Sequence, residues 1–129
     1  MTSFDGINVL LLEDEFLIAM DAEEILTGLG VASVQIAANV ADALALAESG
    51  SFDVAVLDVN INGEMSFSVA RKLREKGVPV VFASGYELQS RPLPPEVGDN
   101  ITSLAKPYSA DRLKEAVASA LAQRQPNAS

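Results

Sequence analysis

Five side chains able to take part in metal or phosphoryl chemistry follow four short apolar runs of the sequence. The acidic pair Glu13 and Asp14 follows the first run, Asp58 the third, Ser84 the fourth and Lys106 the fifth. Oxygen ligands with room for water and phosphate oxygens suit Mg²⁺, with Mn²⁺ as an alternative, rather than zinc or copper. If the runs are strands of one sheet, these residues predict a cation-assisted phosphoryl-transfer site.

Each residue of this group can be given a chemical role. Carboxylates that lie close together raise one another's pKa unless a counter-charge is present, and Lys106 and a cation would supply it. We predict Asp14 and Asp58 as direct metal ligands, with Glu13 nearby or acting through water. A carboxylate oxygen of Asp58 would then attack a phosphoryl group while the cation and Lys106 offset the charge on its equatorial oxygens. Ser84 is placed to donate a hydrogen bond to the new phosphoryl group.

The residue types that the chain lacks narrow the chemistry further. The sequence contains no Cys and no His, which excludes a disulfide, a thiolate nucleophile, an imidazole base and a Cys/His zinc site. Any phosphohistidine in the reaction must therefore be supplied by another protein.

Short apolar runs alternate with segments of helical spacing along the chain, which predicts an α/β domain with a buried parallel sheet. The predicted strands are Asn8 to Leu12, Ser33 to Ile36, Val54 to Leu57, Val78 to Ala83 and Thr102 to Ala105. Such units most readily form a doubly wound, flavodoxin-like five-stranded sheet of order 2-1-3-4-5. In that fold the carboxyl ends of the strands share one edge, so the chemical residues would meet there.

Helical spacing predicts helices after the first, second, third and fifth strands. Gly28 or Gly30 would end the first of them, Asn39 is the predicted N-cap of the second, and Ser109 that of the last. The third would follow Ser66. Between the fourth and fifth strands a regular helix is excluded by three prolines, so the fourth helix should be short or irregular. They are Pro92, Pro94 and Pro95.

Length and charge set the expected class of protein. With 129 residues, 49% of them hydrophobic, the chain should form a single domain over 1–129, with its core in 7–122 and a short polar tail at 123–129. We expect no attached effector domain. The formal net charge of -9 disfavours binding to nucleic acid or anionic membranes, and no signal sequence or membrane span is recognisable. A cytoplasmic protein is expected.

The ordered set of strand-end residues resembles the response-regulator receiver family. That family has an acidic pair after strand one, an acceptor Asp after strand three, Ser or Thr after strand four and Lys-Pro after strand five; the resemblance covers Asn8 to about Ala122. It implies phosphotransfer from a sensor histidine kinase or a histidine phosphotransfer protein to Asp58, and loss of the phosphoryl group by in-line water attack. Such a domain is a signalling module rather than an enzyme. It would switch the binding of a downstream protein or act as a phosphate sink or shuttle.

The segment Phe82-Ala83-Ser84-Gly85-Tyr86 resembles the Phe-Ala-Thr-Gly-Tyr-like signature of a subgroup of single-domain receivers. Members of that subgroup tend to have a disturbed fourth helix. The chain departs from the common receiver pattern at Ser103, where an aromatic residue is usual three positions before the lysine. Tyr86 or Tyr108 could take over the role of that aromatic residue in switching.

The loop after Asp58 is a second departure, because it lacks the familiar Met-Pro pair. We still expect the backbone carbonyl of Asn60 to reach the metal. The output surface, built in other receivers on helix four, strand five and helix five, should also be unusual here.

Three rival hypotheses remain open from the sequence. A haloacid-dehalogenase-like phosphatase also uses a strand-end Asp with Mg²⁺, but it needs a second Asp where this chain has Asn60. A flavodoxin-like protein would bind a flavin phosphate at the first βα turn, which here is acidic and would repel it. A pseudo-receiver would act by docking alone without being phosphorylated.

Overall fold

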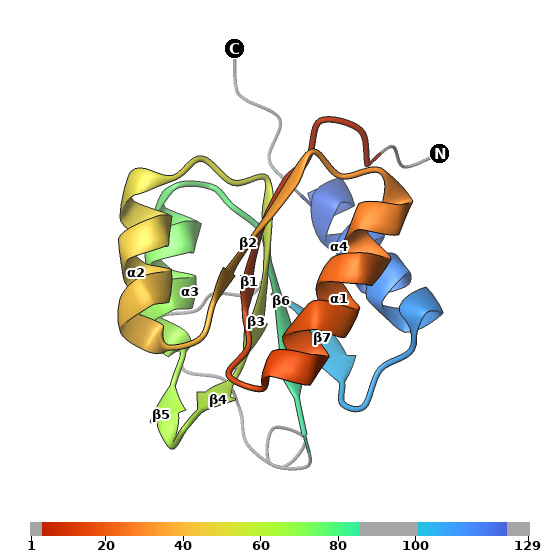
Figure 1. Cartoon of the computed structure of the whole chain (residues 1–129). Helices are drawn as coiled ribbons and strands as arrows, with labels where there is room; N and C mark the ends of the chain where they lie inside the picture. The colour runs from red at the N-terminus through yellow and green to blue at the C-terminus, as the bar shows by residue number, and fades with distance from the viewer. Residues whose placement is uncertain (1–3, 86–100, 124–129) are drawn as a thin grey trace.

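The computed structural model describes residues 4–85 and 101–123, which form a central parallel sheet covered by helices on both faces (Figure 1). Its strands are β1 (Asn8–Leu12), β2 (Ser33–Ala37), β3 (Val54–Asp58), β6 (Val80–Ser84) and β7 (Ile101–Ala105). Their order across the sheet is β2-β1-β3-β6-β7. Since β6 and β7 are the fourth and fifth strands of this sheet along the chain, the predicted order 2-1-3-4-5 is confirmed.

Helices α1 (Phe16–Leu29) and α4 (Ala110–Gln123) cover one face of the sheet, and α2 (Val40–Ser49) and α3 (Phe67–Glu75) cover the other (Figure 1). The label α4 belongs to the helix that follows β7. The predicted irregular helix between the fourth and fifth strands, with its three prolines, falls in 86–100 and lies outside the described residues. The described part of the chain contains no helix that is both long and apolar enough to cross a membrane.

Two of the predicted helix caps are confirmed by hydrogen bonds. The side chain of Asn39 accepts a bond from the amide of Asp42 at 2.8 Å, and the hydroxyl of Ser109 accepts one from the amide of Arg112 at 3.2 Å. These bonds satisfy amides that a helix start leaves without a partner. The first helix ends at Leu29 because Gly30 adopts a left-handed conformation, with φ 103°.

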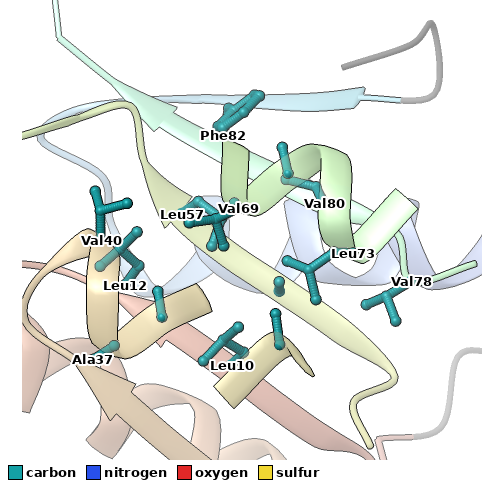
Figure 2. Close-up of a cluster of buried hydrophobic side chains, with 14 of the residues drawn as sticks. Leu10, Leu12, Ala37, Val40, Leu57, Val69, Leu73, Val78, Val80 and Phe82 are labelled. Carbon is teal, nitrogen blue, oxygen red and sulfur yellow. The ribbon is translucent and has the colours of Figure 1, made fainter. Parts of the chain in front are cut away.

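Alternation along the strands divides the core into two clusters. Leu10, Leu12 and Leu57 point toward α2 and α3 (Figure 2), and Val9 and Leu11 point toward α1 and α4. These five side chains are at most 1% exposed. A sheet buried on both faces is a rigid base, and the carboxyl ends of its strands carry the residues singled out above.

Two features differ from the prediction by more than a single residue at a strand end; the other strand bounds shift by at most one residue. The fourth strand of the sheet begins at Val80 rather than Val78, because the amide of Val78 donates to the carbonyl of Leu73 at 2.9 Å and so completes the end of α3. Pro79 has no amide hydrogen to offer the sheet. The second difference is a short antiparallel hairpin after Asp58, formed by β4 (Asn60–Ile61) and β5 (Glu64–Met65).

Candidate functional site

Five of the predicted site residues line a cavity of about 390 Å³ at the carboxyl edge of the sheet. Strand pairing sets their positions: Asp58 pairs with Ala83 on β6, and Ser84 pairs with Ala105 on β7, directly before Lys106. The residues that line the cavity are Asp14, Glu15, Asp58, Val59, Asn60, Asn62, Gly63, Ser84, Gly85 and Lys106. Tertiary structure thus brings four strand ends to one opening.

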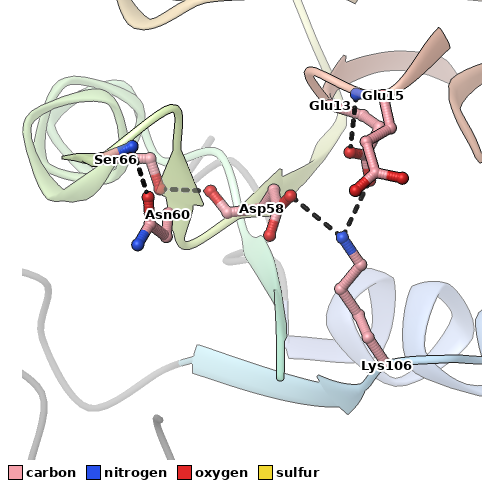
Figure 3. Close-up of polar contacts among 7 residues, drawn as sticks. Glu13, Glu15, Asp58, Asn60, Ser66 and Lys106 are labelled. Atoms are coloured by element: carbon pink, nitrogen blue, oxygen red, sulfur yellow. Dashed lines mark hydrogen bonds and ion pairs between the residues drawn. The ribbon is translucent and has the colours of Figure 1, made fainter. Parts of the chain in front are cut away.

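Lys106 joins two of the carboxylates. Its Nζ lies 3.0 Å from Oδ2 of Asp58 and 3.2 Å from Oε1 of Glu13 (Figure 3). Burial opposes the charge on Lys106, but the hydrogen bonds and attraction of Asp58 and Glu13 outweigh this effect and raise its pKa. Lys106 therefore stays an ammonium group and supplies the predicted counter-charge.

Burial has the largest effect on the pKa of the two carboxylates that contact Lys106, and it raises both pKa values. Burial raises the pKa of Asp58; Lys106 offsets part of this rise, and the negative charge of Asp14 adds to it. Burial likewise raises the pKa of Glu13, against a hydrogen bond from the amide of Glu15 at 3.1 Å. A single ammonium group thus leaves the acidic cluster short of positive charge.

A hard divalent cation fits this donor set. Glu13, Asp14 and Asp58 each offer one carboxylate oxygen, and these three oxygens lie within 4.8 Å of one another. Asp14 and Asp58 line the cavity, whereas Glu13 is only 3% exposed and already accepts bonds from Lys106 and the amide of Glu15. The arrangement supports direct contact of an ion with Asp14 and Asp58, and contact through water with Glu13.

The β4–β5 hairpin shapes the wall of the cavity next to Asp58. The side-chain oxygen of Asn60 accepts a bond from the amide of Gly63 at 2.8 Å, so this side chain closes the turn. A contribution of Asn60 to a metal would therefore come from its backbone carbonyl. Asn62 and Gly63 have positive φ values of 53° and 88°. Asn-Gly is a strong hairpin signal in sequence, and it could have predicted this turn.

Ser66 is a buried residue next to Asp58, and the sequence predicts it only as the residue before the third helix. Its hydroxyl donates to the main-chain carbonyl of Asp58 at 2.6 Å, and the side chain is 0% exposed (Figure 3). A serine just before a helix is usually an N-cap. No sequence signal distinguished this one, because its partner is eight residues earlier and is a backbone atom.

A family model described as the response regulator receiver domain matches residues 9–118. This chain is a member of the receiver family. Receiver domains are signalling modules of two-component systems rather than classical enzymes, and they generally bind Mg²⁺ at an acidic site such as Glu13, Asp14 and Asp58.

Solved receiver structures resemble the chain over nearly its whole length. A response regulator receiver protein from Sinorhizobium medicae is 29% identical with a TM-score of 0.78, and the match covers 95% of this chain and 100% of that one. The solution structure of SdrG from Sphingomonas melonis is 36% identical with a TM-score of 0.71, over 94% and 99% of the two chains. No curated protein sequence matches the chain.

The receiver residues expected to carry the switch are placed as follows. Ser84 is half-buried and lines the cavity, and its carbonyl accepts a bond from the amide of Lys106 at 2.9 Å. Ser103 is exposed on β7. Tyr108 is half-buried against the cluster under α1 and α4, and burial, followed by the charge of Glu13, raises its pKa. Tyr86, and with it the end of the subgroup signature, lies outside the described residues.

Proposed function

We propose that this receiver accepts a phosphoryl group on Asp58 from a phosphohistidine, with Mg²⁺ as the assisting ion and Mn²⁺ as a substitute. The observation that carries the proposal is the contact of Lys106 with Asp58 at 3.0 Å, at a cavity that Asp14 and Ser84 also line. The cavity gives a phosphoryl group access to the acceptor carboxylate, and an ammonium group already lies beside that carboxylate.

In the proposed transfer, a carboxylate oxygen of Asp58 attacks phosphorus in line with the departing imidazole. The new bond is the P–O bond of an acyl phosphate, the bond that breaks is the donor's P–N bond, and the imidazole nitrogen leaves with the electron pair. Lys106 lies beside the charge on the equatorial oxygens, and the Ser84 hydroxyl donates to one of them. The signal ends by hydrolysis: water attacks phosphorus, the P–O bond to Asp58 breaks, and inorganic phosphate leaves.

The ion, when bound by Asp14, Asp58 and the Asn60 carbonyl, supplies positive charge to the transferring oxygens. The other contributions come from residues of the chain itself. Glu13 holds Lys106 from the buried side at 3.2 Å and so directs its ammonium group toward the acceptor.

The phosphoryl donor has to be a second protein, because the sequence contains no His. A sensor histidine kinase or a histidine phosphotransfer protein fits this requirement. Phe16, Leu17 and Met20 at the start of α1 are 72%, 79% and 44% exposed, and they follow Glu15 of the cavity wall. We infer that a donor contacts this apolar surface while its phosphohistidine reaches Asp58.

We propose a stand-alone cytoplasmic receiver over 1–129 that binds neither nucleic acid nor membrane, in keeping with a net charge of -9. Phosphorylation would change its affinity for a downstream protein, or the chain would serve as a phosphate sink or shuttle. The likeness to the single-domain subgroup with the Phe-Ala-Thr-Gly-Tyr-like signature supports this reading.

Observations at the site weigh against the rival functions. The phosphatase would need an acid where Asn60 uses its side chain to close a turn. A flavin phosphate would meet Asp14 and Glu15 at the cavity. A pseudo-receiver would have no use for the ammonium group of Lys106 beside the acceptor.

The proposal is tested with acetyl phosphate as a small donor and Mg²⁺. Intact-protein mass spectrometry should show a gain of one phosphoryl group in the wild type, and no gain in Asp58→Ala or in the presence of chelator. Transfer from a purified phosphorylated kinase then tests the phosphohistidine source. Labelling that persists in Asp58→Ala would rule out Asp58 as the acceptor.

A further inference from the structure

Ser66 makes hydrogen bonds in three directions from a fully buried position. Its amide donates to the carbonyl of Val59 at 2.9 Å, and its hydroxyl donates to the carbonyl of Asp58 at 2.6 Å. Its own carbonyl accepts from the amides of Val69 and Ala70 at 3.1 and 3.2 Å. Ser66 therefore connects the first turn of α3 to the end of β3.

The hydroxyl of Ser66 is not used as a helix cap. A serine before a helix ordinarily accepts a bond from an amide of the first turn, but the side chain of Ser66 makes no such bond. It donates instead to the acceptor residue, where it is 0% exposed. Helix stability alone would favour the usual cap, so the contact with Asp58 calls for a separate explanation.

The bonds from Ser66 fix the peptide planes on the exit side of the acceptor. The carbonyls of Asp58 and Val59 are both held by this one residue, and the amide of Val59 donates to the carbonyl of Ala83 at 3.1 Å. The main chain at Asp58 is thus anchored to α3 as well as to the neighbouring strand. A carboxylate at the end of a strand would otherwise follow any tilt of the peptide plane after it.

We propose that Ser66 is a positioning residue for Asp58, acting through the acceptor's main-chain carbonyl. It holds the backbone so that the Asp58 carboxylate faces Lys106 and the ion, and so that Asn60 lies at the cavity wall. The inference rests on the proposed phosphoacceptor role of Asp58. Loss of a hydrogen bond that orients a metal-binding or reacting residue commonly lowers metal affinity or activity by about 10-fold to 100-fold.

Two substitutions at this position separate hydrogen bonding from packing. Ser66→Ala removes the donor, and Ser66→Cys fills similar space with a weak donor. We expect both to slow labelling of Asp58 by acetyl phosphate at saturating Mg²⁺ by about tenfold or more, and to weaken Mg²⁺ binding in isothermal titration calorimetry by about tenfold. A Cys variant that behaves as wild type in both measurements would show that the strong hydrogen bond of the hydroxyl is not needed, which contradicts the positioning role.

Val69→Ala is the matched control, because Val69 is a fully buried core side chain on the same helix (Figure 2) and does not line the cavity. Urea unfolding measures the stability of every variant. The control should lose stability yet label and bind Mg²⁺ within about twofold of wild type. Equal slowing in the control, or a Ser66→Ala variant within about twofold of wild type in both assays, would overturn the positioning role.

The two readouts also separate this inference from the proposed function. A wild type that binds Mg²⁺ but takes no label contradicts the proposed function, and the Mg²⁺ titration of the Ser66 variants then decides the positioning role alone. A wild type that labels while the variants match it contradicts only the role of Ser66. A wild type that neither labels nor binds Mg²⁺ overturns both.

Discussion

At the scale of single residues, Lys106 connects the buried and the accessible parts of the acidic site. It contacts Glu13, which is 3% exposed, and Asp58 at the cavity. These two contacts orient a flexible side chain whose ammonium group would otherwise be free to turn. In the proposed transfer, the charge that offsets the carboxylates in the resting protein would already be in place beside the transferring oxygens. Such preorganised charge favours reactions of this kind.

Replacing Lys106 should separate metal binding from transfer. We expect Lys106→Met to slow phosphorylation of Asp58 by about 100-fold or more, because an oriented positive group next to the transferring oxygens is lost. Mg²⁺ affinity should stay the same or rise, since a positive charge beside the ion has been removed. Labelling kinetics and calorimetric titration measure the two effects.

Lys114→Met removes the same charge at an exposed position of α4 that does not line the cavity, and it serves as the control. It should leave labelling within about twofold of wild type. A similar loss of rate in both variants would mean that net charge, and not the position of Lys106, controls transfer.

At the scale of elements, the segment between β3 and α3 shapes the site. The hairpin of β4 and β5 gives the cavity Asn60, Asn62 and Gly63, and Ser66 closes the segment against Asp58. This short element explains how the loop lines the acceptor cavity without the Met-Pro pair of other receivers. Its turn depends on backbone conformations that most residues avoid.

Replacement of two glycines by alanine should change the free energy of unfolding in opposite directions. Gly63 has φ 88° with open space around a would-be Cβ, so Gly63→Ala should lower the free energy of unfolding by about 1 kcal/mol through backbone strain alone. Gly28 lies inside α1 with equally open surroundings and no positive φ, so Gly28→Ala should raise it by roughly 0.5–1 kcal/mol. Urea unfolding of both variants checks the pair. A stabilised Gly63→Ala would show that this turn relaxes.

At the scale of the whole molecule, a well-packed core lies next to an acidic site whose carboxylates repel one another. The strands are buried on both faces, and three carboxylates converge at their ends. Core packing has to offset the cost of bringing these charges together. Stability should therefore depend on pH and on Mg²⁺ in a way that can be traced to Asp58.

The raised pKa of Asp58 gives the direction of the pH effect. Folding favours its protonated form, so its contribution to stability is present below the ordinary carboxyl pKa of about 4 and is lost as pH rises through the raised value. In chelator, the free energy of unfolding of Asp58→Asn should fall less with rising pH than that of wild type, and at pH 7 the variant should be the more stable. Urea unfolding at stepped pH measures the difference, and identical slopes would contradict the assignment.

Mg²⁺ should make the wild type more stable than Asp58→Asn at pH 7. At about 100 times its dissociation constant, a ligand of the folded state adds about 2.7 kcal/mol to the free energy of unfolding. Wild type should gain this stabilisation and Asp58→Asn much less of it, because one direct ligand has lost its charge. An equal gain in the two proteins would place the ion elsewhere.

Much of the fold and part of the site could be predicted from the sequence. Apolar runs and helical spacing indicated the five strands of the sheet and their flanking helices, because burial imposes those periods on any chain. Prolines and glycines are equally local signals, and Asn-Gly could have predicted the hairpin. The predicted start of the fourth strand at Val78 was wrong, because the amide of Val78 bonds to the end of α3. Asp14, Asp58, Ser84 and Lys106 were recognisable because each lies at the end of a strand or just after it, and parallel strands end at a common edge.

The order of residues along the chain thus shows which chemical groups are available and at which edge of the sheet they lie. Their partners follow from the packing of the folded chain: Glu13 is buried behind Lys106, and the hydroxyl of Ser66 reaches the carbonyl of Asp58. Side-chain periodicity reports burial and direction, but a hydrogen bond between distant segments depends on positions within a few tenths of an ångström. Those positions are set by the packing of α3 and β7 against the sheet, which no local pattern records.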